Sequence, residues 1–325
     1  MSRRTVVFGG AGFVGCNLAA ALAERGDEVV LFDRTPPPAA ARPNAEILTA
    51  DVRDRSQVAA AIPRGTDCVV WGAAITADAA RDASDPEVVL ETNLAALVPV
   101  LRRAREAGVR RILNLGSAAA YGEAAFRQAP LAEDDPAPDP RSLYALTKFA
   151  GERLCARLAE LWGLDVVTVR LSAVFGPWER PTGARDTPSP FLQLMGLAER
   201  GETARLARPS VRDWLYAPDM ARAALALLDA PRLAHRLYNV GPGAAYSVLD
   251  WGQRLAARRP GFDCRLAQPG ETPNVDPQGS RDRAPLAVAR LVAETGFAAR
   301  FGLEASVAHL DEWARAHPGW FREAT

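Results

Sequence analysis

Tyr144 and Lys148 stand four residues apart near the middle of the chain, and together they could move a proton. The chain has 39 lysine and arginine residues, of which Lys148 is the only lysine. Residues 142–162 predict a helix, and a spacing of four places both side chains on one face of it. A tyrosine hydroxyl loses its proton only at about pH 10 in water, so it needs a positive charge nearby to act as a base. Lys148 would supply that charge, unless the spacing arose by chance.

Ser117 is a third residue that could take part in this chemistry. It follows an expected strand at residues 111–115, directly after a glycine. A serine hydroxyl at that place could hydrogen-bond the same substrate oxygen that Tyr144 deprotonates. The alternative is a strand-end residue that satisfies neighbouring backbone groups.

A glycine-rich turn near the N-terminus predicts a dinucleotide-binding site. Residues 5–8 predict a buried strand, and residues 17–26 predict a helix that ends in glycine. Between them, Gly9 permits a tight turn, Gly12 lets the backbone approach a diphosphate, and Gly15 allows the helix to pack on the strand. A strand, a glycine turn and a helix in this order are the context that a dinucleotide requires.

The residue after the second expected strand, at residues 28–32, bears on which dinucleotide binds. That residue is Asp33, whose carboxylate would accept hydrogen bonds from the ribose hydroxyls of NAD and repel the 2′-phosphate of NADP. Arg34 could instead hold that phosphate, so NADP is the alternative. We expect NAD.

Strands alternate with helices through the first half of the chain. The other expected elements are strands at residues 47–50, 68–71 and 165–171 and a helix at residues 91–105. Asp51 could accept a hydrogen bond from an adenine amino group, and Asp54 would cap the next helix. Ala73 and Ala74 would let the cofactor lie against the backbone. The alternation predicts an α/β fold, a Rossmann-type doubly wound parallel sheet with ligands beyond the carboxyl ends of its strands.

Composition and charge exclude several classes of protein. Apolar residues make up 48% of the chain and the net charge is zero, so nothing indicates a nucleic-acid partner. No apolar run is long enough to span a membrane, and Met1 and the residues after it lead directly into a strand, so we expect a cytoplasmic protein without a secretory leader. The cysteines and histidines lack metal-ligand spacing, so we expect no metal. Four free, buried thiols are expected at Cys16, Cys68, Cys155 and Cys264.

Motifs along nearly the whole chain resemble those of the extended short-chain dehydrogenase/reductases, in the NAD-dependent epimerase/dehydratase group. The matching residues are 9–15, 51–52, 93, 116–122, 144 with 148, 170–177, 212–219 and 238–241. The resemblance implies an NAD-dependent enzyme, a homodimer, and Ser117, Tyr144 and Lys148 as its catalytic residues, with Lys148 also binding the nicotinamide ribose. The implied cofactor-binding residues are Gly9, Gly12, Phe13, Val14, Gly15, Asp33, Arg34, Asp51, Val52, Ala73, Ala74, Asn93, Tyr144, Lys148 and Leu171.

Two departures from the family pattern reduce the number of reactions that the protein could catalyse. Members that eliminate water carry an Asp-Glu pair where this chain has Ala118 and Ala119, which cannot transfer protons, so a dehydratase is disfavoured. The epimerase/reductases that act on deoxy-keto sugars use a cysteine and a histidine as a further acid/base pair. The position of that cysteine, near Ser117, is also an alanine here. Hydride chemistry at one carbon remains, either in an epimerase or, as the alternative, in a dehydrogenase or reductase of a sugar, a sugar acid or another secondary alcohol. A non-catalytic dinucleotide sensor is a third reading, although such proteins typically lack the Tyr and Lys pair.

Two residues give opposing indications about whether the substrate carries a nucleotide diphosphate. Ala173 stands where nucleotide-sugar enzymes of the family place an asparagine, whereas Arg212 stands where they place an arginine that binds the diphosphate. The alternative for Arg212 is a structural ion pair with Asp213. In the expected loop at residues 178–188, Arg180 or Arg185 could clamp a carboxylate or phosphate, so we expect an anionic sugar. The expected substrate-binding residues are Ser117, Ala118, Tyr144, Arg180, Arg185 and Arg212.

The chain should divide into two unequal parts. We expect residues 1–172 with about 211–241 to form the NAD-binding domain, and residues 173–210 with 242–325 to form a substrate-binding lobe. Helices of the second half are expected at residues 190–200, 219–228, 248–258, 284–294 and 303–316, with an irregular loop at residues 269–280. The whole pattern favours an NAD-dependent epimerase of a nucleotide-linked sugar or a sugar acid.

Overall fold

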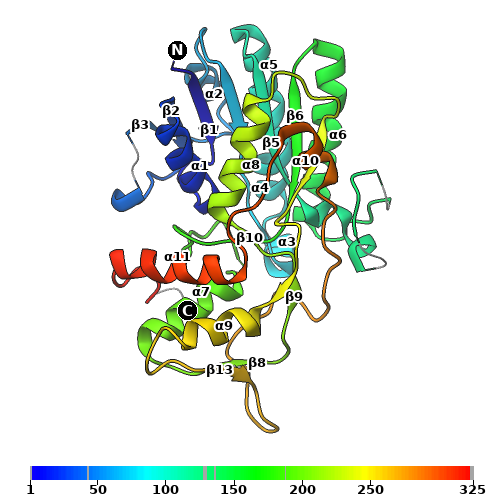
Figure 1. Cartoon of the computed structure of the whole chain (residues 1–325). Helices are drawn as coiled ribbons and strands as arrows, with labels where there is room; N and C mark the ends of the chain where they lie inside the picture. Colours follow the sequence, from blue (N-terminus) through cyan, green and yellow to red (C-terminus); the bar gives the residue numbers. More distant parts are fainter. Residues whose placement is uncertain (1, 42–43, 127–129, 135–136, 187, 323–325) are drawn as a thin grey trace.

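A parallel sheet forms the centre of the larger part of the molecule (Figure 1). The computed structural model describes residues 2–41, 44–126, 130–134, 137–186 and 188–322, so Met1 and Thr187 of the expected loop lie outside the described residues. Within these ranges the sheet has seven strands in the order β11-β6-β5-β4-β1-β2-β3, all parallel. The strands are β1 (Arg4–Phe8), β2 (Glu28–Asp33), β3 (Ala45–Thr49), β4 (Cys68–Trp71), β5 (Arg111–Ser117), β6 (Val166–Leu171) and β11 (Leu237–Val240). The strand order reverses between β1 and β4, which confirms the expected doubly wound fold.

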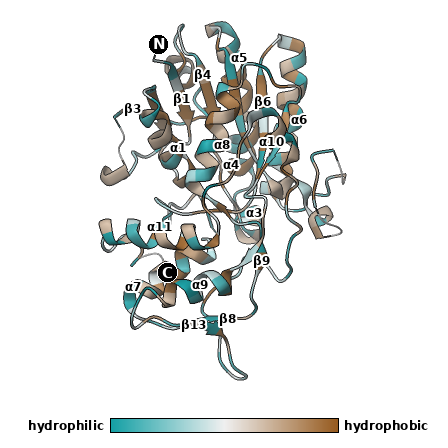
Figure 2. Ribbon diagram, viewed as in Figure 1, coloured by the Kyte–Doolittle hydropathy of each residue, from teal (hydrophilic) through white to brown (hydrophobic). Residues whose placement is uncertain are grey.

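Helices cover both faces of this sheet because successive strand residues point to opposite sides. Val7 and Leu31 pack on one face, against α1 (Phe13–Glu24) and α8 (Ala217–Asp229). The neighbouring residues Val6 and Val30 pack on the other face. The helices on that face are α2 (Arg55–Ala61), α5 (Leu97–Ala107) and α6 (Leu143–Trp162). Figure 2 shows these strands as the most hydrophobic part of the molecule, as expected for a sheet buried on both sides.

A smaller lobe with its own core lies beyond the carboxyl ends of the strands (Figure 1). Phe175 stacks on Phe191 with ring centroids 3.8 Å apart, and Trp214 and Trp251 pack edge-on against Phe191. The helices of the lobe are α7 (Pro190–Arg200), α9 (Val248–Ala256) and α11 (Leu303–Ala316). Its short strand pairs are β8 (Ala204–Leu206) with β13 (Cys264–Leu266), and β9 (Val211–Arg212) with β12 (Tyr246–Ser247). The exact boundaries expected for the two domains stay a prediction.

Several elements differ from the expected ones at their ends. The helix expected at residue 91 begins earlier, as α4 (Pro86–Leu90), and continues through a π-helical turn, Glu91–Ala95, into α5. The helix expected at residue 284 begins only at α10 (Ala289–Thr295). It starts late because the backbone N–H groups of Leu286 and Ala287 are already bonded, to the Asp213 carboxylate and the Leu131 carbonyl. Asp54 caps α2 as expected, accepting from two backbone N–H groups.

Two expectations about side chains and membranes can be compared with the structure. All four cysteines are buried and unpaired, as expected. Among the described residues, no helix is both long and apolar enough to cross a bilayer.

Candidate active site

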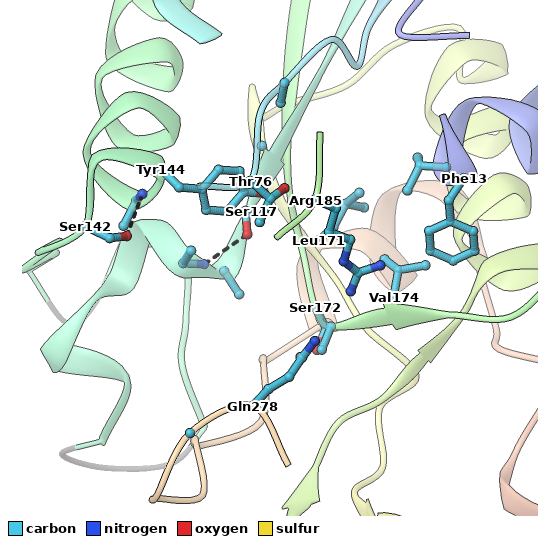
Figure 3. Close-up of a pocket in the computed structure, with 18 of the residues that line it drawn as sticks. Phe13, Thr76, Ser117, Ser142, Tyr144, Leu171, Ser172, Val174, Arg185 and Gln278 are labelled. Atoms are coloured by element: carbon cyan, nitrogen blue, oxygen red, sulfur yellow. Dashed lines mark hydrogen bonds between the residues drawn. The ribbon is translucent and has the colours of Figure 1, made fainter. Parts of the chain in front are cut away.

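A cavity of about 800 Å³ lies where the carboxyl ends of the strands face the lobe. The glycine turn of residues 9–15 lines one end of it, and Ser117, Tyr144 and Arg212 also line its wall. Figure 3 shows Tyr144 and Ser117 on one side of this cavity, with Arg185 and Phe13 across from them. The expected chemistry-bearing residues from β5, α6 and the lobe therefore meet in one space.

Tyr144 and Ser117 are each fixed by local backbone structure. Tyr144 is the second residue of α6, whose N-terminus is capped by the Ser142 hydroxyl accepting from the Ala145 N–H at 3.2 Å. Ser117 is the last residue of β5, and its Oγ accepts from the Ala119 N–H at 3.1 Å. Because Oγ is the acceptor in that bond, its own hydrogen is free to donate to a ligand oxygen in the cavity.

Lys148 is placed one helical turn after Tyr144, but not at the cavity surface. Its Nζ donates to the carbonyl oxygen of Leu115 at 2.7 Å and lies 5.7 Å from the centre of the Tyr144 ring. It is not among the described residues that line the cavity. The lysine thus joins α6 to β5 and holds a positive charge beside the tyrosine.

The glycine turn leaves a backbone-lined cradle that a dinucleotide diphosphate fits. Gly9 has a φ of +76°, and a Cβ on it would lie 2.7 Å from the backbone nitrogen of Ala73. A Cβ on Gly15 would lie 2.3 Å from the Gly9 carbonyl oxygen, so neither position tolerates a side chain. At Gly12 the nearest atom to such a Cβ is 3.3 Å away, and the space there opens towards both cavities. Phe13 and Val14 follow at the first turn of α1 and line the larger cavity.

A second cavity, of about 140 Å³, continues from the glycine turn past the end of β2. Asp33 lies in it, and its carboxylate accepts from the Ala11 N–H at 3.1 Å. Burial raises the pKa of Asp33, while hydrogen bonds from the backbone of Ala11 and neighbouring residues oppose the rise. Arg34 is exposed at its edge. These features fit an adenosine ribose whose hydroxyls donate to Asp33.

Most of the other expected cofactor residues line one of the cavities, and the rest support the cavity walls. Asp51, Val52, Ala73 and Ala74 line the second cavity, and Leu171 lines the first. Arg53 hydrogen-bonds Asp51 at 2.7 Å and thereby lowers the pKa of that carboxyl.

Asn93 does not line either cavity among the described residues. Its side chain is buried and clamps the backbone of Ile75, accepting from its N–H at 2.7 Å and donating to its carbonyl at 2.9 Å. It therefore shapes the segment after β4 that forms the cavity wall.

Arg212 presents an incompletely satisfied guanidinium to the larger cavity. Its Nε is buried and has no hydrogen-bond partner among the described residues, while one terminal nitrogen donates to the Gln278 carbonyl at 3.1 Å. The ion pair with Asp213 considered from the sequence does not form, because Asp213 pairs with Arg283 at 2.6 Å. Burial and the charge of Arg283 lower the pKa of Arg212 to about 10, so it stays protonated at neutral pH. An anion in the cavity would relieve this unfavourable environment.

The two arginines of the loop after β7 (Val174–Phe175) differ in their partners. Arg185 lines the larger cavity but is bonded to the buried Glu179 at 2.8 Å. Arg180 lines both cavities and makes no hydrogen bond or ion pair with any described residue. Ala118 also lines the larger cavity, as expected.

Some cavity residues could not be found from the sequence. Thr76, Glu179, Gln278 and Arg283 all line the larger cavity. Gln278 and Arg283 lie in or just after a loop expected to be irregular, where no periodicity indicates which side chains turn inward.

The sequence between residues 5 and 241 matches the family model described as the NAD dependent epimerase/dehydratase family. The chain belongs to this family. The resemblance seen in the motifs is thus confirmed, and so are the Rossmann-type fold and NAD as the cofactor of this enzyme family.

Sequence relatives and solved structures resemble this chain over three quarters of its length or more. UDP-glucose 4-epimerase of Streptomyces lividans is 29% identical over 263 residues, covering 76% of this chain and 78% of that protein. The structure of MoeE5 in complex with UDP-glucuronic acid and NAD is 26% identical, with a TM-score of 0.77 over 97% of this chain and 100% of that one. UDP-glucose 4-epimerase of Thermus thermophilus in complex with NAD is 26% identical, with a TM-score of 0.75 over 95% and 99% of the chains.

Proposed function

We propose that this protein is an NAD-dependent 4-epimerase of a nucleotide-linked sugar, and that the sugar is anionic. The observation that carries the proposal is the cavity that joins Ser117 and Tyr144 to the guanidinium of Arg212, which has no counter-ion among the described residues. Relatives named UDP-glucose 4-epimerase and UDP-glucuronate 4-epimerase support the same reaction class.

In this mechanism Ser117 and Tyr144 act on one hydroxyl of the sugar. The glycine turn and Asp33 would hold NAD, which would supply reversible hydride transfer at the carbon that bears this hydroxyl. Tyr144 takes the hydroxyl proton and later gives it back, while the Ser117 hydroxyl hydrogen-bonds the same oxygen and orients it. The charge of Lys148 favours the deprotonated form of the tyrosine, and the family resemblance implies that the same ammonium would also hold the nicotinamide ribose.

Arg212 would bind the diphosphate of the nucleotide sugar, with Arg283 beside it. Arg283 already carries Asp213 as a counter-ion, whereas Arg212 has none among the described residues. A buried guanidinium without a counter-ion binds a phosphate strongly, because no carboxylate competes for its charge and water has little access to it. Arg185, which is bonded to Glu179, is a weaker candidate for direct contact with the sugar.

A dehydrogenase or reductase is the second candidate. Ala173 lines the cavity where nucleotide-sugar enzymes of the family place an asparagine, and its methyl group offers nothing for a diphosphate to bond. This favours a smaller alcohol or a free sugar acid that leaves the cofactor reduced. A dinucleotide sensor without activity is the least supported reading, since Ser117 and Tyr144 face the cavity together.

We also propose a homodimer, in the cytoplasm, built on the exposed leucines of α4 and α6. Leu90, Leu146 and Leu161 are 42%, 42% and 56% exposed. Leu97 and Leu101 of α5 are fully buried in the sheet core and cannot belong to this surface. Size-exclusion chromatography with light scattering would measure the mass, and a monomer at micromolar concentration would contradict the dimer.

Product analysis tests the proposed reaction. The protein would be incubated with NAD and with UDP-, GDP- and dTDP-linked sugars and free uronates, and the products separated by chromatography. We expect conversion of a nucleotide-linked sugar to its 4-epimer without build-up of reduced cofactor. Oxidation of a free sugar acid with stoichiometric NADH would support the dehydrogenase instead.

A further inference from the structure

Arg180 is the one charged side chain among the described residues that line both cavities. The residues common to the two cavities are Gly9, Gly12, Gly72, Ala74, Arg180, Thr182 and Ala184. The rest of this set offers backbone groups, methyl groups and one hydroxyl. The junction is therefore the place where a ligand that fills both cavities passes beneath the guanidinium of Arg180.

A dinucleotide that filled both cavities would have its diphosphate at this junction. The smaller cavity holds Asp33, which fits the adenosine ribose, and the larger one holds Tyr144, where the nicotinamide end must lie. The bridging diphosphate then spans the region between them, beside Gly12 and the start of α1. The first turn of α1 carries no basic side chain, so the glycine turn supplies N–H groups but no full positive charge.

The charge of Arg180 reaches the glycine turn. The Cys16 thiol lies on the first turns of α1, with its sulfur 3.5 Å from the carbonyl oxygen of Ala11. Burial raises the pKa of this thiol to about 12, and the positive charge of Arg180 opposes the rise. The guanidinium therefore acts electrostatically on the same backbone segment that would cradle a diphosphate.

The loop that carries Arg180 is held in place from both sides. On one side, Asn17 of α1 donates to the carbonyl of Pro177 at 2.7 Å. On the other, the indole nitrogen of Trp320 donates to the carbonyl of Glu179 at 2.9 Å. Trp178, between them, takes a φ of +67°, which a tryptophan rarely adopts and which the surrounding contacts must maintain. Arg180 is thus presented by a fixed backbone, while its own side chain has no hydrogen-bond or ion-pair partner among the residues that the structure describes.

We propose that Arg180 binds the diphosphate of the bound dinucleotide and holds it against the glycine turn. The loop beyond β7 thereby completes the cofactor site, and Arg180 is a cofactor-retaining residue. This assignment replaces the substrate contact expected from the sequence. It depends on the dinucleotide alone and holds whichever sugar the enzyme converts.

Binding measurements with a graded set of ligands test the proposal. Dissociation constants of NAD, ADP-ribose and adenosine would be measured by calorimetry for the cofactor-free wild type and for Arg180→Gln, Arg180→Lys and the control Arg64→Gln. Loss of a charged hydrogen bond should weaken NAD and ADP-ribose by about 10- to 100-fold in Arg180→Gln, and leave adenosine, which lacks the diphosphate, unchanged. Arg180→Lys should recover part of the loss, because it keeps the charge but not the fork of donors.

A control variant should keep its NAD affinity, and two outcomes would overturn the proposal. Arg64→Gln, at an exposed position that lines neither cavity, should leave NAD affinity within about twofold of wild type, as for a solvated surface charge. Unchanged NAD affinity in a folded Arg180→Gln variant, together with a raised KM for the sugar, would overturn the proposal and return Arg180 to the substrate. Equal weakening of adenosine would also overturn it, since that effect does not depend on the diphosphate. Thermal unfolding of each variant checks that it is folded.

Discussion

The ammonium of Lys148 donates a hydrogen bond to the carbonyl oxygen of Leu115 across 2.7 Å. Leu115 lies two residues before Ser117 on β5, and Lys148 lies one helical turn after Tyr144 on α6. The contact ties the strand that carries the serine to the helix that carries the tyrosine. The only lysine of the chain therefore holds two elements together, in addition to placing a charge beside the tyrosine ring.

Lys148→Arg should lower kcat by about 100-fold or more, the range for loss of acid–base assistance. The charge is kept, but a planar guanidinium cannot take the place of a compact ammonium between a backbone carbonyl and a ribose. Steady-state kinetics would measure the loss. Arg153→Lys, an exposed change on the same helix, is the control and should have no effect. Near-normal turnover in Lys148→Arg would show that the spacing has no catalytic meaning.

Tyr144→Phe should reduce kcat by about 10²- to 10⁴-fold, because it removes the group that moves the proton. KM for the sugar and the dissociation constant of NAD should change little, since the ring and its packing remain. Ser117→Ala should cost less, about 10-fold, the worth of one neutral hydrogen bond to the reacting oxygen. A Tyr144→Phe variant that altered only KM would assign the tyrosine to binding and contradict the mechanism.

Strands and glycine turns were predictable because local patterns encode them. The β-branched runs before Gly9, Asp33 and Gly72 correctly predicted β1, β2 and β4, since strands buried on both faces are continuously apolar. By contrast β11 (Leu237–Val240) was recognised only as a motif. It is four residues long and contains the buried Asn239, whose side chain donates to the Leu131 carbonyl at 2.8 Å. A strand that contains a polar residue bonded to a distant partner lacks the continuous apolar pattern from which buried strands are predicted.

The placement of residues at the carboxyl ends of the strands was also predictable, while the pairing of the arginines was not. Asp33 and Ser117 follow directly from strands that end at one edge of the sheet. The partners of the arginines depend on contacts far apart in the chain. Arg283 pairs with Asp213 at 2.6 Å, across 70 residues of sequence, and Arg212 is left without a counter-ion in the described part of the chain. The sequence of a loop alone does not indicate which arginine will pair with a carboxylate so far away in the chain.

Arg212→Gln should raise KM for the nucleotide sugar by about 10- to 100-fold, the worth of a charged hydrogen bond to a phosphate. Removing the charge should not disturb the fold, because the guanidinium is itself poorly satisfied where it is buried. NAD affinity should stay constant. Arg205→Gln, whose side chain is bonded to the carbonyl of Thr272 outside the cavity, is the matched control. A KM unchanged in Arg212→Gln would favour the dehydrogenase acting on a smaller substrate.

Asp33→Asn should weaken NAD by about 10-fold and reduce the preference for NAD over NADP, because the amide no longer repels a 2′-phosphate. Since burial raises the pKa of Asp33, NAD affinity should also decline on acidification earlier than an ordinary aspartate would predict. Calorimetry with both cofactors over a range of pH would measure these effects. A stronger loss in Arg34→Ala than in Asp33→Asn would indicate that the arginine selects the cofactor.

Acidification should also destabilise the lobe through His309. Its ring nitrogen Nδ1 lies 2.7 Å from the Tyr216 hydroxyl, and burial lowers the pKa of this histidine. The unfolded chain then binds a proton more readily than the folded one, so stability falls as the pH drops below the ordinary histidine pKa of about 6.5. The slope cannot exceed about 1.4 kcal/mol per pH unit for one proton. Urea unfolding of His309→Gln should show a smaller loss between neutral and mildly acidic pH. An identical loss in the variant would exclude this histidine as the cause.

Proton NMR of the reaction in deuterium oxide tests the central claim most directly. The protein and NAD would be incubated with UDP-glucose, UDP-glucuronate and the other nucleotide sugars, and the hydrogen at the inverted carbon would be followed. Transfer to NAD and back predicts a 4-epimer that keeps protium at this carbon, with no net formation of NADH. Deuterium at that carbon, or an oxidised sugar released with an equal amount of NADH, would contradict the account.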